Sequence, residues 1–332
     1  MTDSHLRGPI PGTPFLPMAQ IAPAAAGSVR EEWFVSGTAP GYAIAGERTP
    51  DGRWDVAPAA KEPFTTRIVV CRPASPARFR GTVLVEWLNV SGGLDGAPDF
   101  LFLHRHLMRE GMAWVGVSVQ KAGIDGGGLV PGMPLKQADP TRYGALVHPG
   151  DAFAFGIFGE VARALRARGA GPLGPLEAQR LIAIGESQSA GFLVTYANAV
   201  DPLDRCFDAF LLHGRPGAAA GLDGRYVRAA RDGDLSNVGS LRTAGHRVRE
   251  DVRVPVLVLQ SETDVVALGG GRARQSDAER FRLWEIAGAA HFDTYGLVAA
   301  PADREGIPIE ELAARMAPTR EPMGMKADAL VN

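Results

Sequence analysis

The stretch LIAIGESQSAGF, residues 181–192, contains an apolar run that ends at a glycine, followed by two serines two positions apart. The apolar run predicts a buried strand, and the residues after the second serine predict a helix. A sharp turn between a strand and a helix holds a serine in a strained backbone conformation with its hydroxyl exposed. The residues two before and two after that serine must be small, and Gly185 and Ser189 meet this condition around Ser187.

Ser189 is the alternative centre of the same turn. Centring the motif there places Ser187 and Gly191 at the small positions, but it moves the glycine away from the end of the strand. We therefore predict Ser187 as the nucleophile. Because short matches of this kind also occur by chance, the rest of the chain has to supply the partners.

A serine nucleophile needs a base and a group that orients the base. Of the seven histidines, His246 and His291 lie far enough downstream, and His246 sits in the polar stretch TAGHRVRED, which favours a solvated loop. His291 directly follows a predicted strand, in the small-residue loop AGAAHFD. The strand before that one ends within VLVLQSETDVV, residues 256–266, and Asp264 just after it is the predicted acid. Glu262, two residues earlier and with a longer side chain, is the alternative.

Two backbone N–H groups should stabilise the oxyanion. One is predicted at Gln188, which follows the nucleophile at the start of its helix. The other should come from the loop EWLNVSGG, residues 86–93, where Asn89 is the first choice and Val90 the second.

The chain around these motifs alternates short apolar runs with amphipathic stretches. Strands are predicted over 64–73, 81–89, 113–120, 180–185, 207–214, 254–261 and 282–288, and helices over 98–111, 149–170, 188–199 and, briefly, 276–281. This order predicts an α/β fold, with a mostly parallel central sheet and helices on both faces.

The domain organisation follows from the same reading. We expect an extended N-terminal arm over residues 1–30 and a single domain over 31–332. Segments 121–148 and 215–250 interrupt the alternation after predicted strands, so they are candidate cap or rim insertions, with plain surface loops as the alternative.

Composition narrows the class of protein. The 332 residues are 45% hydrophobic and carry a formal charge of −2, which gives no electrostatic case for binding nucleic acid or an anionic membrane. The N-terminus lacks a signal-peptide pattern and no apolar run approaches the ~18 residues that span a bilayer, so we expect a soluble, cytoplasmic protein. Cys71 and Cys206 are expected to be buried free thiols. The glycine-rich stretches lack the Lys-Ser/Thr of a phosphate loop, and we expect no cofactor and no metal.

Five segments together resemble a known family. They are EEWFVSGTAPGY (31–42), VLVEWLNVSGG (83–93), RYGALVHPGDAFAFGIF (142–158), GESQSA (185–190) and ETDVV to RFRLWEIAGAAHFD (262–293). As a set they resemble the α/β-hydrolase domain proteins of the Abhydrolase_10 type. The resemblance implies an α/β-hydrolase fold, a catalytic triad at Ser187, Asp264 and His291, and an esterase-like activity without a defined substrate. It also leads us to expect relatives to continue past the final KADALVN into a further helix.

We therefore interpret the sequence as that of a serine hydrolase that cleaves small carboxylic esters through an acyl-enzyme, with His291 ionising near the usual ~6.5. Two alternatives remain open: an acyltransferase or lyase on the same fold, and a non-catalytic hydrolase-like binding protein. The sequence does not indicate an oligomeric state.

Overall fold

The fold is described from a computed structural model that covers residues 5–17, 27–128, 130–167, 171–225, 245–293, 296 and 308–316. Parts of the predicted arm, residues 226–244 of the second candidate insertion and residues 317–332 lie outside this description.

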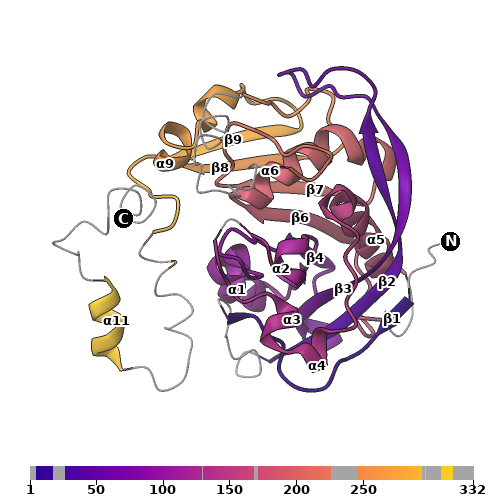
Figure 1. The fold of residues 1–332 in the computed structure, drawn as a ribbon. Coiled ribbons are helices and arrows are strands. Elements are labelled where there is room, and N and C mark those ends of the chain that lie inside the picture. The colour runs from indigo at the N-terminus through magenta and orange to yellow at the C-terminus, as the bar shows by residue number, and fades with distance from the viewer. Residues whose placement is uncertain are drawn as a thin grey trace.

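One nine-stranded sheet organises the molecule, in the order β1-β2-β3-β5-β4-β6-β7-β8-β9 (Figure 1). The strands are β1 (His5–Arg7), β2 (Ser28–Ile44), β3 (Val56–Pro73), β4 (Thr82–Trp87), β5 (Ala113–Val117), β6 (Arg180–Glu186), β7 (Ala209–His213), β8 (Val256–Ser261) and β9 (Phe281–Ile286). The pairs from β5 to β9 are parallel, whereas β1, β2 and β3 join antiparallel at one side. The prediction of a mostly parallel central sheet is confirmed.

Helices cover both faces of this sheet, as predicted. The helices are α1 (Pro98–Glu110), α2 (Lys121–Asp125), α3 (Leu135–Ala138), α4 (Pro140–Tyr143), α5 (Ala154–Arg166), α6 (Gln188–Thr195), α7 (Asp201–Asp204), α9 (Glu262–Val266) and α11 (Ile309–Met316). Helix α1 packs with Leu84 and Ile184 on one face, and α5 and α6 join the larger core on the other. None of the described helices is long and apolar enough to cross a membrane.

The long β2–β3 hairpin is the largest feature that sequence patterning missed. It curves along one side of the molecule (Figure 1), and its strands pair over most of their length. The first half of β3 is exposed and contains Pro58 and Pro63, so it lacks the apolar alternation that marks a strand. Pairing with β2, rather than local propensity, makes this segment extended. On its other side β2 pairs with β1, which lies within the predicted N-terminal arm.

The predicted helix over residues 276–281 is wrong. Ala278 and Phe281 form an antiparallel bridge around a tight turn, and the Asp277 side chain accepts a hydrogen bond from the N–H of Leu283. The seven residues between a 3₁₀ turn that ends at Ala273 and the start of β9 give too few backbone hydrogen bonds to offset the cost of starting a helix.

The candidate insertion 121–148 lies against the loop that follows β4. Gly93, with a φ of +68°, approaches this segment so closely that a Cβ there would lie 2.4 Å from the Val130 carbonyl oxygen. Gly132 faces Gly93 with equal closeness. Segment 121–148 therefore packs directly against the loop in which the second oxyanion donor is predicted.

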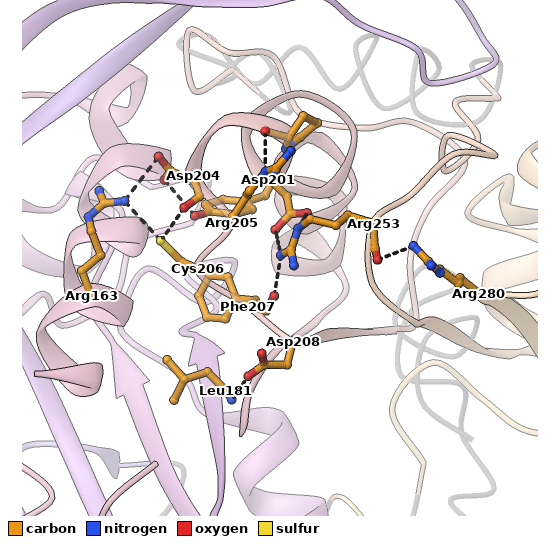
Figure 2. Close-up of polar contacts among 12 residues, drawn as sticks. Arg163, Leu181, Asp201, Asp204, Arg205, Cys206, Phe207, Asp208, Arg253 and Arg280 are labelled. Atoms are coloured by element: carbon orange, nitrogen blue, oxygen red, sulfur yellow. Dashed lines mark hydrogen bonds and ion pairs between the residues drawn. The ribbon is translucent and has the colours of Figure 1, made fainter. Parts of the chain in front are cut away.

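A cluster of charged side chains ties the elements together near the amino ends of β7 and β8 (Figure 2). Arg163 of α5 lies 3.3 Å from the Asp204 carboxylate and donates to the sulfur of Cys206. Arg253 pairs with Asp201 at 2.8 Å and donates to the Phe207 carbonyl. Both free cysteines, Cys71 and Cys206, are buried, as expected.

Candidate active site

Ser187 occupies the sharp turn between β6 and α6, with φ 58° and ψ −117°. A positive φ is uncommon for a residue with a side chain and stores backbone strain. The flanking small residues face each other, because a Cβ on Gly185 would lie 2.9 Å from the Cβ of Ser189. This contact explains why the turn needs a glycine and a small residue around Ser187, and Ser189 itself is completely buried.

The His291 ring lies between Ser187 and Asp264. Its Nε2 is 2.8 Å from the Ser187 Oγ, and its Nδ1 is 2.5 Å from the Asp264 Oδ1. Gly214 gives the ring room, since a Cβ there would approach the His291 ring at 3.2 Å and 3.3 Å. The three side chains predicted to act together are therefore within hydrogen-bonding distance of one another in the required order.

Asp264 is held by the first turn of its own short helix. Ser261 is the N-cap of α9, and its Oγ accepts from the Asp264 N–H while donating to the Asp264 Oδ2. The Ser261 N–H donates to the same oxygen at 2.7 Å. This reciprocal capping box leaves Oδ1 free to accept from His291.

Glu262, the alternative acid, lies elsewhere. Its Oε2 accepts a hydrogen bond from the Gly288 N–H at 2.8 Å, in the loop that leads to His291. Glu262 thus contacts the backbone of the histidine loop, while the carboxylate at the imidazole is that of Asp264.

The two expected oxyanion donors differ in their availability. Gln188 is the first residue of α6, where backbone N–H groups have no partner within the helix. The N–H of Asn89 donates to the Gly96 carbonyl at 2.9 Å, so it is occupied and does not suit the role expected for it. Within the described residues the Val90 N–H donates to no acceptor.

Glu186, the residue before Ser187, was not singled out from the sequence. Its Oε1 lies 3.0 Å from the His291 Nε2, the same nitrogen that faces Ser187. The Asn89 side-chain amide donates to the Glu186 Oε2 and to its carbonyl oxygen. The signal was present, because Glu186 is the variable residue inside the serine motif and ends a buried strand.

The two carboxylates change the ionisation of His291. Burial alone would lower its pKa, but the hydrogen bonds to Asp264 and Glu186 and the charges of both raise the pKa to about 10. The expectation of an ordinary histidine is therefore wrong, because sequence patterning did not place a second carboxylate at the ring.

A second histidine lies beside the first. His213 ends β7, its carbonyl accepts from the Ser187 N–H, and its Nδ1 lies 2.8 Å from the Asp99 Oδ1. Burial lowers the pKa of His213, but Asp99, Glu186 and Asp264 together raise it. Burial also raises the pKa of Asp99 and, well above its usual value, that of Glu86, whose oxygens accept from the first turn of α1.

A family model for the α/β-hydrolase domain, Abhydrolase_10, matches residues 4–332. The chain belongs to this α/β-hydrolase family. The match confirms the resemblance seen in the sequence, and the predicted α/β-hydrolase fold is confirmed with it.

Several solved structures are similar to this chain at low sequence identity. An α/β serine hydrolase without a lid from Xanthomonas campestris is 14% identical with a TM-score of 0.41, covering 85% of this chain and 97% of its own. A fungal esterase from Rhizomucor miehei is 13% identical with a TM-score of 0.40, covering 88% and 83%. A carboxylesterase from Lactobacillus plantarum is 13% identical with a TM-score of 0.41, covering 76% and 83%. No curated protein matches the chain.

Proposed function

We propose that this α/β hydrolase cleaves carboxylic esters with Ser187 as nucleophile, His291 as general base and Asp264 as the orienting acid. The observation that carries the proposal is the His291 ring, which bridges the Ser187 Oγ at 2.8 Å and the Asp264 Oδ1 at 2.5 Å. Such an arrangement on a strained strand-to-helix turn suits nucleophilic catalysis.

In the first half-reaction, the Ser187 Oγ attacks the ester carbonyl carbon while His291 Nε2 takes the hydroxyl proton. The carbonyl oxygen becomes an oxyanion, for which the Gln188 N–H is one donor, and we assign the second to the Val90 N–H because that of Asn89 is occupied. Collapse of the tetrahedral intermediate expels the alcohol, which receives the proton from His291.

In the second half-reaction, water replaces the alcohol. His291 takes a proton from the water as its oxygen attacks the acyl-enzyme, and collapse returns that proton to the Ser187 Oγ and releases the acid. Asp264 stabilises the imidazolium that forms in each half. The proposed substrate is a small ester whose carbonyl carbon the Ser187 hydroxyl can reach.

The proposal is tested by the hydrolysis of a short p-nitrophenyl ester by matched serine variants. Ser187→Ala should reduce turnover to the level that oxyanion donors and binding alone support, about 10³–10⁴ over water. Ser189→Ala removes the neighbouring hydroxyl and should retain activity, because Ser189 is buried under the turn.

Three other outcomes would contradict the proposal. Loss of activity in Ser189→Ala with retention of activity in Ser187→Ala would indicate that Ser189 is the nucleophile. Release of p-nitrophenol that depends on an added alcohol acceptor would indicate an acyltransferase. Folded protein that turns over no ester would indicate a binding protein.

A further inference from the structure

The His291 Nε2 faces two acceptors at once. The Ser187 Oγ lies at 2.8 Å and the Glu186 Oε1 at 3.0 Å. A nitrogen and a carboxylate oxygen this close form a hydrogen bond only if a proton lies between them, on either atom. In both cases the Nε2 lone pair is unavailable to take the proton of Ser187.

Glu186 is held in this position from its far side. The Asn89 Nδ2 donates to the Glu186 Oε2 at 3.3 Å and to the Glu186 carbonyl at 3.0 Å. The Asn89 Oδ1 in turn accepts from the Ser91 N–H at 2.8 Å. With its side chain 7% exposed, Glu186 is shielded from the water that would otherwise screen its charge.

The charged groups around the pair come from four elements. Asp264 of α9 faces the opposite nitrogen of His291, and His213 of β7 interacts with both Asp264 and Glu186. Asp99 of α1 contacts the His213 ring and interacts electrostatically with Glu186. Glu86 of β4 interacts electrostatically with Asp99. This side of the site thus places three carboxylates, those of Asp264, Glu186 and Asp99, around two histidines, which favours keeping the proton on His291.

We propose that Glu186 is a positioning residue that holds a proton at the His291 Nε2 in the resting enzyme, and thereby sets the pH above which His291 acts as a base. The proton leaves to solvent hydroxide or water before the attack of Ser187, and Nε2 then accepts the serine proton. The same carboxylate stabilises the imidazolium that forms during acyl transfer. The inference rests on the proposed function for its kinetic readout only.

The test compares Glu186→Gln with wild type in two measurements. The first is the pH profile of kcat/KM for a neutral ester, which reports the ionisation of the free enzyme. The second is the NMR titration of the His291 Cε1–H, assigned with His291→Ala, which needs no catalysis. Loss of an opposite charge at contact distance should move both midpoints to lower pH by about 1 to 3 pH units.

Two further variants sharpen the comparison. Glu186→Asp keeps the charge but shortens the side chain, and it should give a midpoint between those of wild type and Glu186→Gln. Glu110→Gln removes an exposed carboxylate that pairs with Arg109 at the end of α1, and it should leave both midpoints unchanged.

The outcomes separate this inference from the proposed function. An unchanged NMR midpoint in Glu186→Gln would overturn the inference, as would a uniform loss of kcat/KM at every pH with an unchanged acid limb. A lowered NMR midpoint in a protein that hydrolyses no ester would support the proton-holding role of Glu186 and refute the esterase.

Discussion

Single carboxylates decide what His291 does. Asp264 lies at the Nδ1 and Glu262 at the Gly288 backbone, so the two acids within one short helix have different tasks. Asp264→Asn should lower kcat by about 10⁴, because the amide favours the wrong tautomer of the imidazole. Glu262→Gln should lower kcat by less than about 10², through a looser histidine loop.

Initial rates on folded protein, checked by circular dichroism, measure both variants. A larger fall in kcat for Glu262→Gln than for Asp264→Asn would indicate that Glu262, and not Asp264, orients His291.

The strain at Ser187 makes a separate prediction about stability. A residue with a side chain at φ 58° and ψ −117° is strained by about 1–3 kcal/mol, and glycine relieves that strain. Ser187→Gly should therefore be more stable than Ser187→Ala by about 1 kcal/mol in free energy of unfolding, after the entropic cost of glycine is subtracted. Urea unfolding measures the difference, and the glycine variant should unfold at the higher urea concentration. Equal or lower stability of the glycine variant would mean that the turn is not strained.

The sequence predicted Ser187, Asp264 and His291 just after strands, and in the structure they follow β6, β8 and β9. It favoured Asp264 over Glu262 without locating the contacts of either side chain, and it missed Glu186. These contacts depend on side-chain directions and on the approach of Asn89, in the loop after β4, to the end of β6, which no local pattern encodes. The occupied N–H of Asn89 likewise depends on its bridge to Gly96.

Helix α9 links the stability of the fold to the geometry of the site. Ser261 caps this helix and binds the Asp264 carboxylate through both its N–H and its hydroxyl. Ser261→Ala should cost about 0.5–2 kcal/mol in unfolding free energy, the usual price of a lost N-cap. It should also lower kcat, because Asp264 is then less firmly oriented toward His291.

The control is Ser276→Ala, at an exposed serine near the turn before β9, which should change neither quantity. If the free energy of unfolding of Ser261→Ala falls by the predicted amount but kcat does not fall, Asp264 is held in place by other contacts.

The elements themselves were predictable where burial dominates. The parallel strands of the core carry continuous apolar runs, whereas β2 and the first half of β3 alternate little and include prolines. Their extension comes from pairing between distant segments. The helix predicted over 276–281 is absent for a different reason: its helix-forming residues occupy a connection that is too short for a helix.

At the scale of the whole molecule, the ionisation of the site should make stability fall as the pH rises. The pKa of His291 is raised to about 10 in the folded protein against about 6.5 when unfolded, so between these values the folded state binds the additional proton. Its stabilising contribution is complete below about pH 6.5 and is lost as the pH rises through about 10. The raised pKa of His213 acts in the same direction.

Urea unfolding at about pH 7 and about pH 8.5 measures this loss. The difference in unfolding free energy between the two conditions should shrink in Glu186→Gln and stay unchanged in Glu110→Gln. Equal differences in wild type and Glu186→Gln would mean that Glu186 does not hold the proton of His291.

Covalent labelling by a fluorophosphonate, located by peptide mass spectrometry, tests directly whether Ser187 is the nucleophile. We expect the Ser187 Oγ to displace fluoride, which leaves one phosphonyl group per chain on Ser187. The adduct should be absent in Ser187→Ala and His291→Ala and present in Ser189→Ala. An adduct on Ser189, or no adduct on folded wild-type protein, would show that Ser187 is not the nucleophile.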